Sequence, residues 1–260
     1  MDGNCLYVVA GGITGLAVGL TGVGGGALMT PLLLLLFGIA PTTAVATDLW
    51  FAAATKVVAV SVHRRHATID WLVVRRLWLG SIPLALVSVW IAGHVQPASK
   101  SAWLSHLIGV MVCIAALGML AGPRIVRALA AQRPPSTVAR PWQAPLTMAA
   151  GAALGAAVAF TSVGAGTLGS VMLMALYPLR LTVHRLVMAD LVHAIPLSLV
   201  AGLAYGAHGL VDWPLLGMLL LGSVPGAIAG GLLAGRLPPR PLQVALAAAL
   251  LLAGGKAAFG

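Results

Sequence analysis

The stretch GLTGVGGGALMTPLLLLLFG, from Gly19 to Gly38, decides how this chain folds. It joins a glycine-rich turn to a run of leucines and contains no charged side chain. Lipid cannot satisfy the peptide groups that glycine leaves bare, so such backbone is tolerated in a membrane only where it is buried in protein or lines a cavity. The stretch therefore predicts a broken apolar segment inside a membrane protein.

The rest of the chain is equally apolar. Of its 260 residues, 60% are hydrophobic and 8% are charged, whereas charged residues make up about a quarter of a soluble globular protein. A bilayer-spanning helix needs about 20 apolar residues, and runs of this kind fill nearly the whole chain. We therefore predict an all-α integral membrane protein whose function resides within the bilayer.

Turn and charge signals delimit ten hydrophobic segments. The first membrane repeat spans 1–121, a cytoplasmic basic linker spans 122–145, and the second membrane repeat spans 146–260. The segments 26–38 and 166–178 are too short to cross comfortably, so we expect them to be short or re-entrant, with about 8–10 membrane segments in all. The ten segments lie near 5–22, 26–38, 43–62, 72–93, 102–121, 146–161, 166–178, 184–205, 213–235 and 241–259.

The two halves are similar in sequence, which indicates an internal repeat. A shift of 140 residues places TGVGGG, Thr21 to Gly26, over TSVGAG, Thr161 to Gly166. A shift of 142 residues places Asp48-Leu49 over Asp190-Leu191. Each half holds an odd number of segments, so the second half enters the membrane from the opposite side if all of them cross. The pattern predicts two inverted repeats.

The basic residues indicate the orientation in the membrane. The net charge is +10, but the charges form short clusters between apolar segments, so we expect no nucleic-acid partner. Under ten crossings all twelve arginines fall in loops on one side, and the positive-inside rule makes that side cytoplasmic. We expect a multi-pass protein of a bacterial-type inner membrane with both termini on the periplasmic face.

The two glycine motifs form the predicted substrate site. Short helices that begin at such turns offer free N–H groups and positive dipole ends to an anion, and nearby hydroxyls add donors. The alternative is close helix packing through small residues, while a nucleotide loop is disfavoured because no Lys-Ser or Lys-Thr pair follows. The candidate residues are Thr21, Gly22, Gly24, Gly25, Gly26, Thr161, Ser162, Gly164, Gly166 and Thr167.

Two carboxylates lie deep in predicted spans, at equivalent positions of the repeats. Asp48 and Asp190 are costly to place in a membrane and are functional candidates by default. They could couple transport to protons or cations, with His193 one turn beyond Asp190, or could simply bond to nearby backbone. Lys56 follows Asp48 by two helical turns on nearly the same face, where it could pair with an acid, contact the anion or snorkel. Asp70 and Asp212 are expected to cap the segments that follow them.

The chain resembles the TauE/SafE family of sulfite and organosulfonate transporters, also called the 4-toluene sulfonate uptake permease family. The resemblance rests on Gly19 to Gly38, its echo in the second half, and the length and duplicated organisation of the chain. It implies transport of sulfite, thiosulfate, sulfonates or related anions. The second half departs from the family motif, with Ala165 for the middle glycine and Val171 where Pro31 aligns.

The leading hypothesis is a secondary transporter of small anions that works by alternating access of the repeats, with proton coupling as a second hypothesis. An anion or other solute channel, a carrier of a different small solute, and a structural membrane partner are the alternatives. We predict no enzyme, because five acids and no glutamate leave no convergent catalytic set, and we expect no cofactor and no metal site. The expected partners are a small anionic substrate and the lipid bilayer, and a homodimer remains open.

Overall fold

The protein is an all-helical bundle in its computed structural model, which describes residues 3–21, 26–63, 69–94, 142–162, 167–177 and 183–233, with isolated residues from 106 to 131 and from 244 to 256. Within these ranges every regular element is a helix and there is no strand, which confirms the predicted all-α class. The helices are α1 (Gly3–Thr21), α2 (Gly26–Leu35), α3 (Pro41–His63), α4 (Trp71–His94), α6 (Gln143–Thr161), α7 (Thr167–Leu176), α8 (Val183–Ala207) and α9 (Trp213–Leu233).

Helix length separates spanning helices from short ones. Five described helices, α3, α4, α6, α8 and α9, are long and apolar enough to cross a membrane, as a multi-pass membrane protein requires. α2 and α7 have ten residues each, a length of about 15 Å, which is half of the roughly 30 Å hydrocarbon core. They correspond to the segments 26–38 and 166–178 that the sequence marks as short. The segments 102–121 and 241–259 fall where only isolated residues are described.

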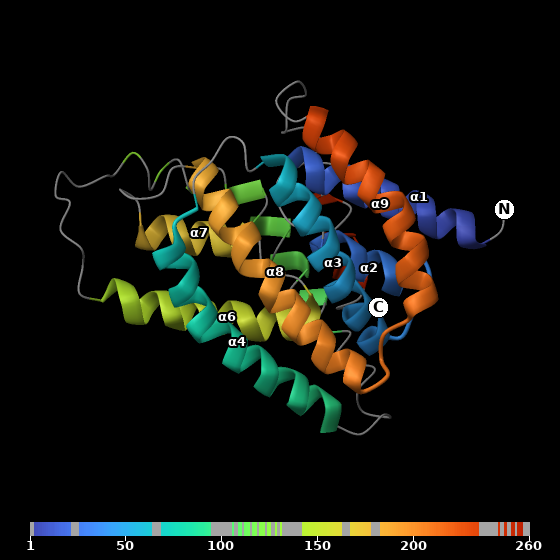
Figure 1. Cartoon of the computed structure of the whole chain (residues 1–260), viewed down its shortest axis with the longest axis horizontal. Coiled ribbons are helices and arrows are strands. Elements are labelled where there is room, and N and C mark those ends of the chain that lie inside the picture. Colours follow the sequence, from blue (N-terminus) through green and yellow to red (C-terminus); the bar gives the residue numbers. More distant parts are fainter. Residues whose placement is uncertain are drawn as a thin grey trace.

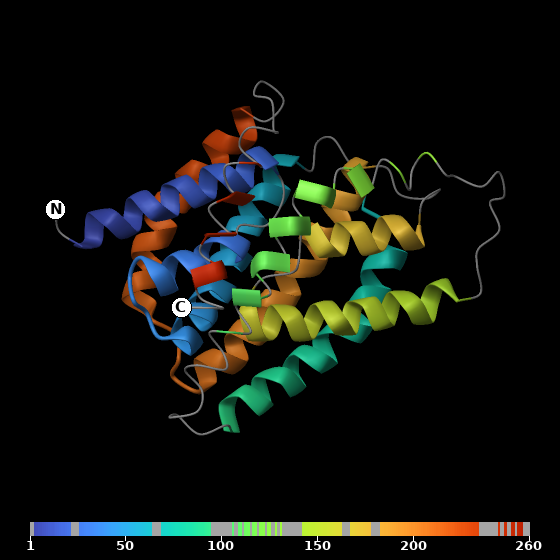
Figure 2. The ribbon, with the colours of Figure 1, turned by 180° about the vertical axis from the view of Figure 1, so that it is seen from behind.

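Helices from the two halves pair with each other rather than with their neighbours in sequence. α1 packs along α9, α4 packs along α6, and α3 and α8 pack together between these pairs, as Figures 1 and 2 show from opposite sides. The short helices α2 and α7 rest on α3 and α8 respectively. The first and second halves of the chain are therefore interleaved through the whole bundle.

Glycines allow the outer pairs to approach closely. A Cβ at Gly15 of α1 would overlap the carbonyl of Ser223 in α9, and a Cβ at Gly155 of α6 would overlap the carbonyl of Ser81 in α4. These contacts occupy equivalent positions under the shifts of 140 and 142 residues. Without a hydrophobic driving force between helices in lipid, small residues at the contact make van der Waals association possible. Close packing through small residues is thus realised by glycines of α1 and α6 outside the candidate motifs.

Two aspartates begin the long helices that follow the third element of each half. The Oδ1 atom of Asp212 accepts a hydrogen bond from the Leu215 N–H at 3.0 Å, and the Oδ1 atom of Asp70 accepts one from the Val73 N–H at 3.4 Å. Each bond satisfies one of the free donors in a first helical turn. The capping prediction for both aspartates is confirmed.

The end of α7 is held by polar contacts with α4 and α6. The Tyr177 hydroxyl accepts a hydrogen bond from Arg76 Nη1 at 3.0 Å and shares one with Thr147 Oγ1 at 2.8 Å. The Gln143 side-chain amide donates to the carbonyl of Leu176 at 2.9 Å, satisfying a carbonyl of the last turn. These bonds fix the C-terminal end of the short helix, so that its N-terminal end has a defined position.

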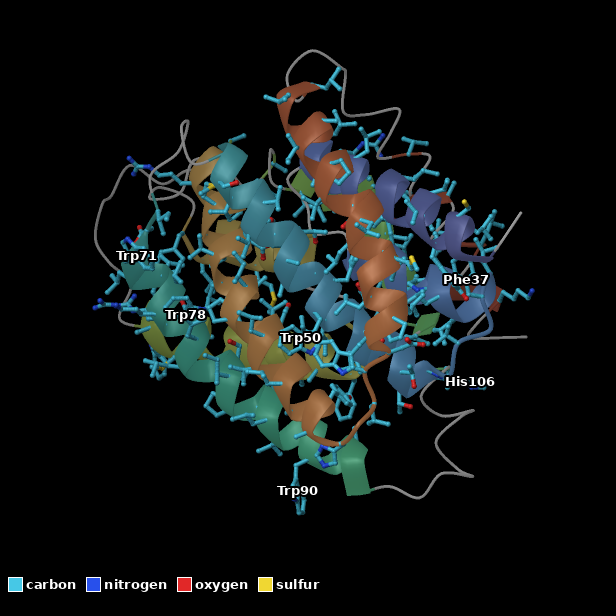
Figure 3. The ribbon with its side chains drawn as sticks, turned by 45° about the vertical axis from the view of Figure 1, so that its right-hand side comes forward. Phe37, Trp50, Trp71, Trp78, Trp90 and His106 are labelled. Carbon is cyan, nitrogen blue, oxygen red and sulfur yellow. The ribbon has the colours of Figure 1, made fainter. Side chains whose placement is uncertain are left out.

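The outer surface of α4 is apolar. Trp90 is 61% exposed and projects away from the bundle, whereas Trp78 turns toward the neighbouring helices (Figure 3). Trp50 lies over the middle of the bundle in the same view and packs against Gly202 of α8. Exposed apolar side chains on a helix of spanning length fit a surface that contacts lipid.

Candidate functional site

A cluster of charged and titratable side chains is buried between α3 and α8. Asp48 and His193 are fully buried, and Lys56 and Asp190 are 2% and 3% exposed. The Lys56 ammonium interacts electrostatically with Asp190 and, more weakly, with Asp48, and its charge also acts on His193. The structure thus brings together all four residues proposed for coupling or charge pairing, and Lys56 does not snorkel.

The two oxygens of Asp48 have different surroundings. Its Oδ2 atom accepts hydrogen bonds from the backbone N–H of Thr30 at 3.1 Å and from the Thr30 hydroxyl at 2.5 Å. Its Oδ1 atom has no hydrogen-bond partner among the residues the structure describes. Thr30 lies in α2 directly before Pro31, and a residue before proline is biased away from helical geometry. That bias fits the use of the Thr30 N–H by a side chain from another helix.

Ser162 approaches the same carboxyl from the second half of the chain. It ends α6 in a left-handed conformation, with φ 54° and ψ 2°, and its N–H donates to the Val158 carbonyl at 2.7 Å. Its side chain faces the Asp48 carboxyl, although its Oγ atom, like Asp48 Oδ1, has no hydrogen-bond partner in the described part of the chain. The end of one glycine motif's preceding helix therefore meets the acid of the other repeat.

Asp190 sits against the start of α7. A Cβ at Gly169 would overlap its Oδ1 atom, so glycine is needed there to admit the carboxylate. Asp190 is also the stronger electrostatic partner of Lys56. Each aspartate thus lies beside the short helix of its own repeat, Asp48 against α2 and Asp190 against α7.

His193 links α8 to α4. Its Nε2 atom shares a hydrogen bond with Ser81 Oγ at 2.9 Å, and its carbonyl accepts one from Trp78 Nε1 at 3.1 Å. Phe51 is the equivalent residue of the first repeat, and Ser198 is the equivalent of Lys56. The two halves of the site therefore carry different ionisable groups.

The predicted motif residues lie at helix ends. Thr21 ends α1, Gly26 begins α2, Thr161 ends α6 and Thr167 begins α7. The Thr161 hydroxyl donates to the Ala157 carbonyl of its own helix at 2.6 Å, which occupies its proton. Figure 2 shows α2 and α7 on opposite sides of the molecule's middle. The remaining candidates, Gly22, Gly24, Gly25, Gly164 and Gly166, lie outside the described residues.

Sequence reasoning missed three residues of this cluster: Thr30, Ser81 and Gly169. Thr30 and Ser81 had a usable signal, because each aligns with a serine of the other repeat, Ser170 and Ser223. Gly169 had none, since Met29 is its equivalent in the first repeat.

A metal site finds no support in the described part of the chain, where no three His, Cys, Asp or Glu side chains gather. The cluster instead offers one ammonium group, two carboxyl groups, one imidazole and several hydroxyls. Such a set can bind an anion at the lysine and exchange protons at the carboxyls.

Comparisons with known proteins agree on one class. A family model described as "Sulfite exporter TauE/SafE" matches residues 7–257. The chain is 36% identical over 259 residues to the probable membrane transporter protein YjnA of Bacillus subtilis (strain 168), covering 96% of this chain and 97% of that protein. It is 29% identical over 231 residues to a probable membrane transporter protein of Xylella fastidiosa (strain 9a5c), covering 87% and 83%. No solved structure gives a significant match.

Proposed function

Because the chain belongs to the TauE/SafE family and is a membrane transporter, we propose that it carries small anions, most simply sulfite, thiosulfate or organosulfonates, as a secondary transporter. We place it in a bacterial-type inner membrane, with the arginine-bearing loops in the cytoplasm and both termini on the periplasmic face. The substrate is held between the two glycine motifs and Lys56.

The observation that carries the proposal is the burial of Lys56 between two aspartates of the central helices. Removing an ion from water costs several kcal/mol, and ionisable residues inside a membrane mark substrate or ion pathways. An ammonium group attracts an oxyanion far more strongly in a poorly solvated interior than in water. In the empty site the aspartates balance this charge, and an entering anion would compete with them for it.

Alternating access of two inverted repeats is the proposed mechanism. The equivalent contacts of α1 with α9 and of α6 with α4 support it, as do the matching glycine contacts at Gly15 and Gly155. Two units that share central helices and interlock by equivalent contacts can rock around a site at their interface.

Charge balance supports proton coupling. A site with one ammonium and two carboxylate groups is already negative, so a further anion is repelled unless a carboxylate takes up a proton. Binding of the anion and of the proton are then mutually favourable, and a pH gradient can drive the anion.

Flux measurements in proteoliposomes test the proposal. Radiolabelled sulfite, thiosulfate and a small sulfonate are supplied with and without a pH gradient to the wild type, to Lys56→Met and to Lys56→Arg. We expect saturable flux in the wild type, loss of that flux in Lys56→Met, and partial retention in Lys56→Arg, which keeps the charge. Equal flux in Lys56→Met and wild type would contradict the anion site, and non-saturable flux without counterflow would favour a channel.

A further inference from the structure

We propose that Asp48 is the residue that carries the coupling proton, held on Oδ1 and donated in a hydrogen bond to Ser162 Oγ, so that the proton joins the two halves of the transporter. This inference deepens the proposed function and rests on it for the role of the proton in transport. The site itself, a carboxyl and a hydroxyl with a proton between them, is defined by the geometry of the empty protein.

The first argument is the difference between the two carboxyl oxygens of Asp48. Both donors of Thr30 bind Oδ2, whereas Oδ1 is buried and has no hydrogen-bond partner among described residues. An ionised carboxylate would leave the acceptor sites of Oδ1 unsatisfied in a place without water. A proton on Oδ1 removes the charge and turns this oxygen into a donor.

The second argument is the acceptor that faces it. Ser162 is 5% exposed, its side chain faces the Asp48 carboxyl, and its Oγ atom has no hydrogen-bond partner in the described ranges. Two unpartnered oxygens that face each other lack only a proton to form a hydrogen bond. A metal ion would instead require several oxygen ligands.

The backbone of Ser162 supports a use for its side chain. It is the one non-glycine residue with a positive φ among those the structure describes. This conformation is unfavourable for residues with a Cβ and favours glycine, and glycine stands at the equivalent position of the first repeat, Gly22. A strained residue at such a position indicates that the hydroxyl has a function.

The neighbouring charges favour Asp48 over Asp190 as the proton carrier. Lys56 interacts most strongly with Asp190 and therefore stabilises that carboxylate in its ionised form. His193 on α8 is the other titratable group facing the cluster, and it is bonded to Ser81. Of the other helices against α3, the described α2, α6 and α9 carry no ionisable side chain, and α1 carries only Cys5 and Tyr7.

Proton binding would therefore act on the relative position of the repeats. The Oδ1–H···Oγ bond would tie α3 and α2 of the first half to the end of α6 in the second half. Loss of the proton would leave a carboxylate facing a serine that can turn away. Proton release and separation of the two halves are then the same event.

Infrared spectroscopy of the full chain in lipid, titrated with pH and without any substrate, tests the site. The chain has only five acidic residues and no glutamate, so a protonated carboxyl can be assigned by single substitution. We expect a protonated carboxyl band near neutral pH that is absent in Asp48→Asn, present in the matched control Asp190→Asn, and shifted in Ser162→Gly. Asp48→Asn should fold, because its amide can accept from Thr30 and donate to Ser162.

The outcomes separate this inference from the proposed function. Absence of the band in the wild type, its persistence in Asp48→Asn, or flux driven by a sodium gradient alone would overturn it. Anion flux in Asp48→Asn that still follows the pH gradient would also overturn it while leaving the anion transporter intact. Lack of anion flux in a wild type that shows the Asp48 band would instead overturn the proposed function.

Discussion

Substituting Gly15 by alanine tests how the two halves are joined. The Cβ of an alanine at this position would lie 2.6 Å from the Cα atom of Ser223 and would overlap its carbonyl oxygen. Carbon atoms in van der Waals contact are about 3.5–4.0 Å apart, so α1 and α9 would have to separate by about 1 Å along a tightly packed seam. Overpacking of this kind costs about 1–3 kcal/mol.

Gly12 of the same helix provides a matched control. A Cβ there would lie 3.6 Å from the Gly222 carbonyl oxygen, which is an ordinary contact. Alanine in a helix is favoured over glycine by about 1 kcal/mol, so Gly12→Ala is expected to be neutral or stabilising. The two substitutions add the same methyl group to the same helix, and the structure predicts opposite signs for them.

Thermal unfolding of the purified protein in detergent, followed by tryptophan fluorescence, measures both effects. We expect Gly15→Ala to lower the midpoint by several degrees and Gly12→Ala to leave it unchanged or raise it. Gly155→Ala should behave like Gly15→Ala, because its Cβ would meet Ser81 of α4 in the same way. If Gly15→Ala and Gly12→Ala unfold at the same temperature, α1 and α9 do not pack as described.

Three further predictions concern single contacts. Thr30→Val removes the hydroxyl bonded to Asp48 at 2.5 Å and should lower the free energy of unfolding by about 1–3 kcal/mol, with Thr30→Ser restoring it; equal stability of the valine and serine variants would contradict the bond. Asp212→Ala removes the cap of α9 and should cost about 1 kcal/mol in the same assay, whereas an unchanged stability would show that the cap is dispensable. Cys5, an exposed free cysteine, should react with a membrane-impermeant maleimide in intact cells if the N-terminus is periplasmic, and Cys5→Ser, which keeps Cys113, is the control; reaction only after lysis would invert the topology.

Much of the fold follows from the sequence because the membrane restricts the choice of structure. Apolar runs bounded by charges and turns must become helices in lipid, and the predicted segment 184–205 differs by at most two residues at each end from α8. The short segment 26–38 becomes a ten-residue helix, since glycines before it and the turn after it leave no more apolar chain to extend. The number of crossings and the inverted relation of the halves stay predictions.

The candidate site could be predicted only where the residue type itself is costly. Asp48, Lys56, Asp190 and His193 are rare in an apolar chain, and this rarity points to them without knowledge of their neighbours. Thr30 and Gly169 are common residue types in membrane helices, so their roles depend on what lies beside them. A threonine that binds a carboxyl and one that bonds its own helix, such as Thr161, cannot be told apart in sequence.

The sequence by itself determined the membrane class, the helical segments, the duplication and the ionisable residues, because these depend on hydrophobicity and on local spacing along the chain. Only the tertiary structure decided that α1 pairs with α9 and α4 with α6, that Lys56 favours Asp190, and that Ser162 faces Asp48. These relations join residues more than a hundred positions apart. They depend on the close packing of glycine-bearing helices from both halves, which periodicity along one helix does not specify.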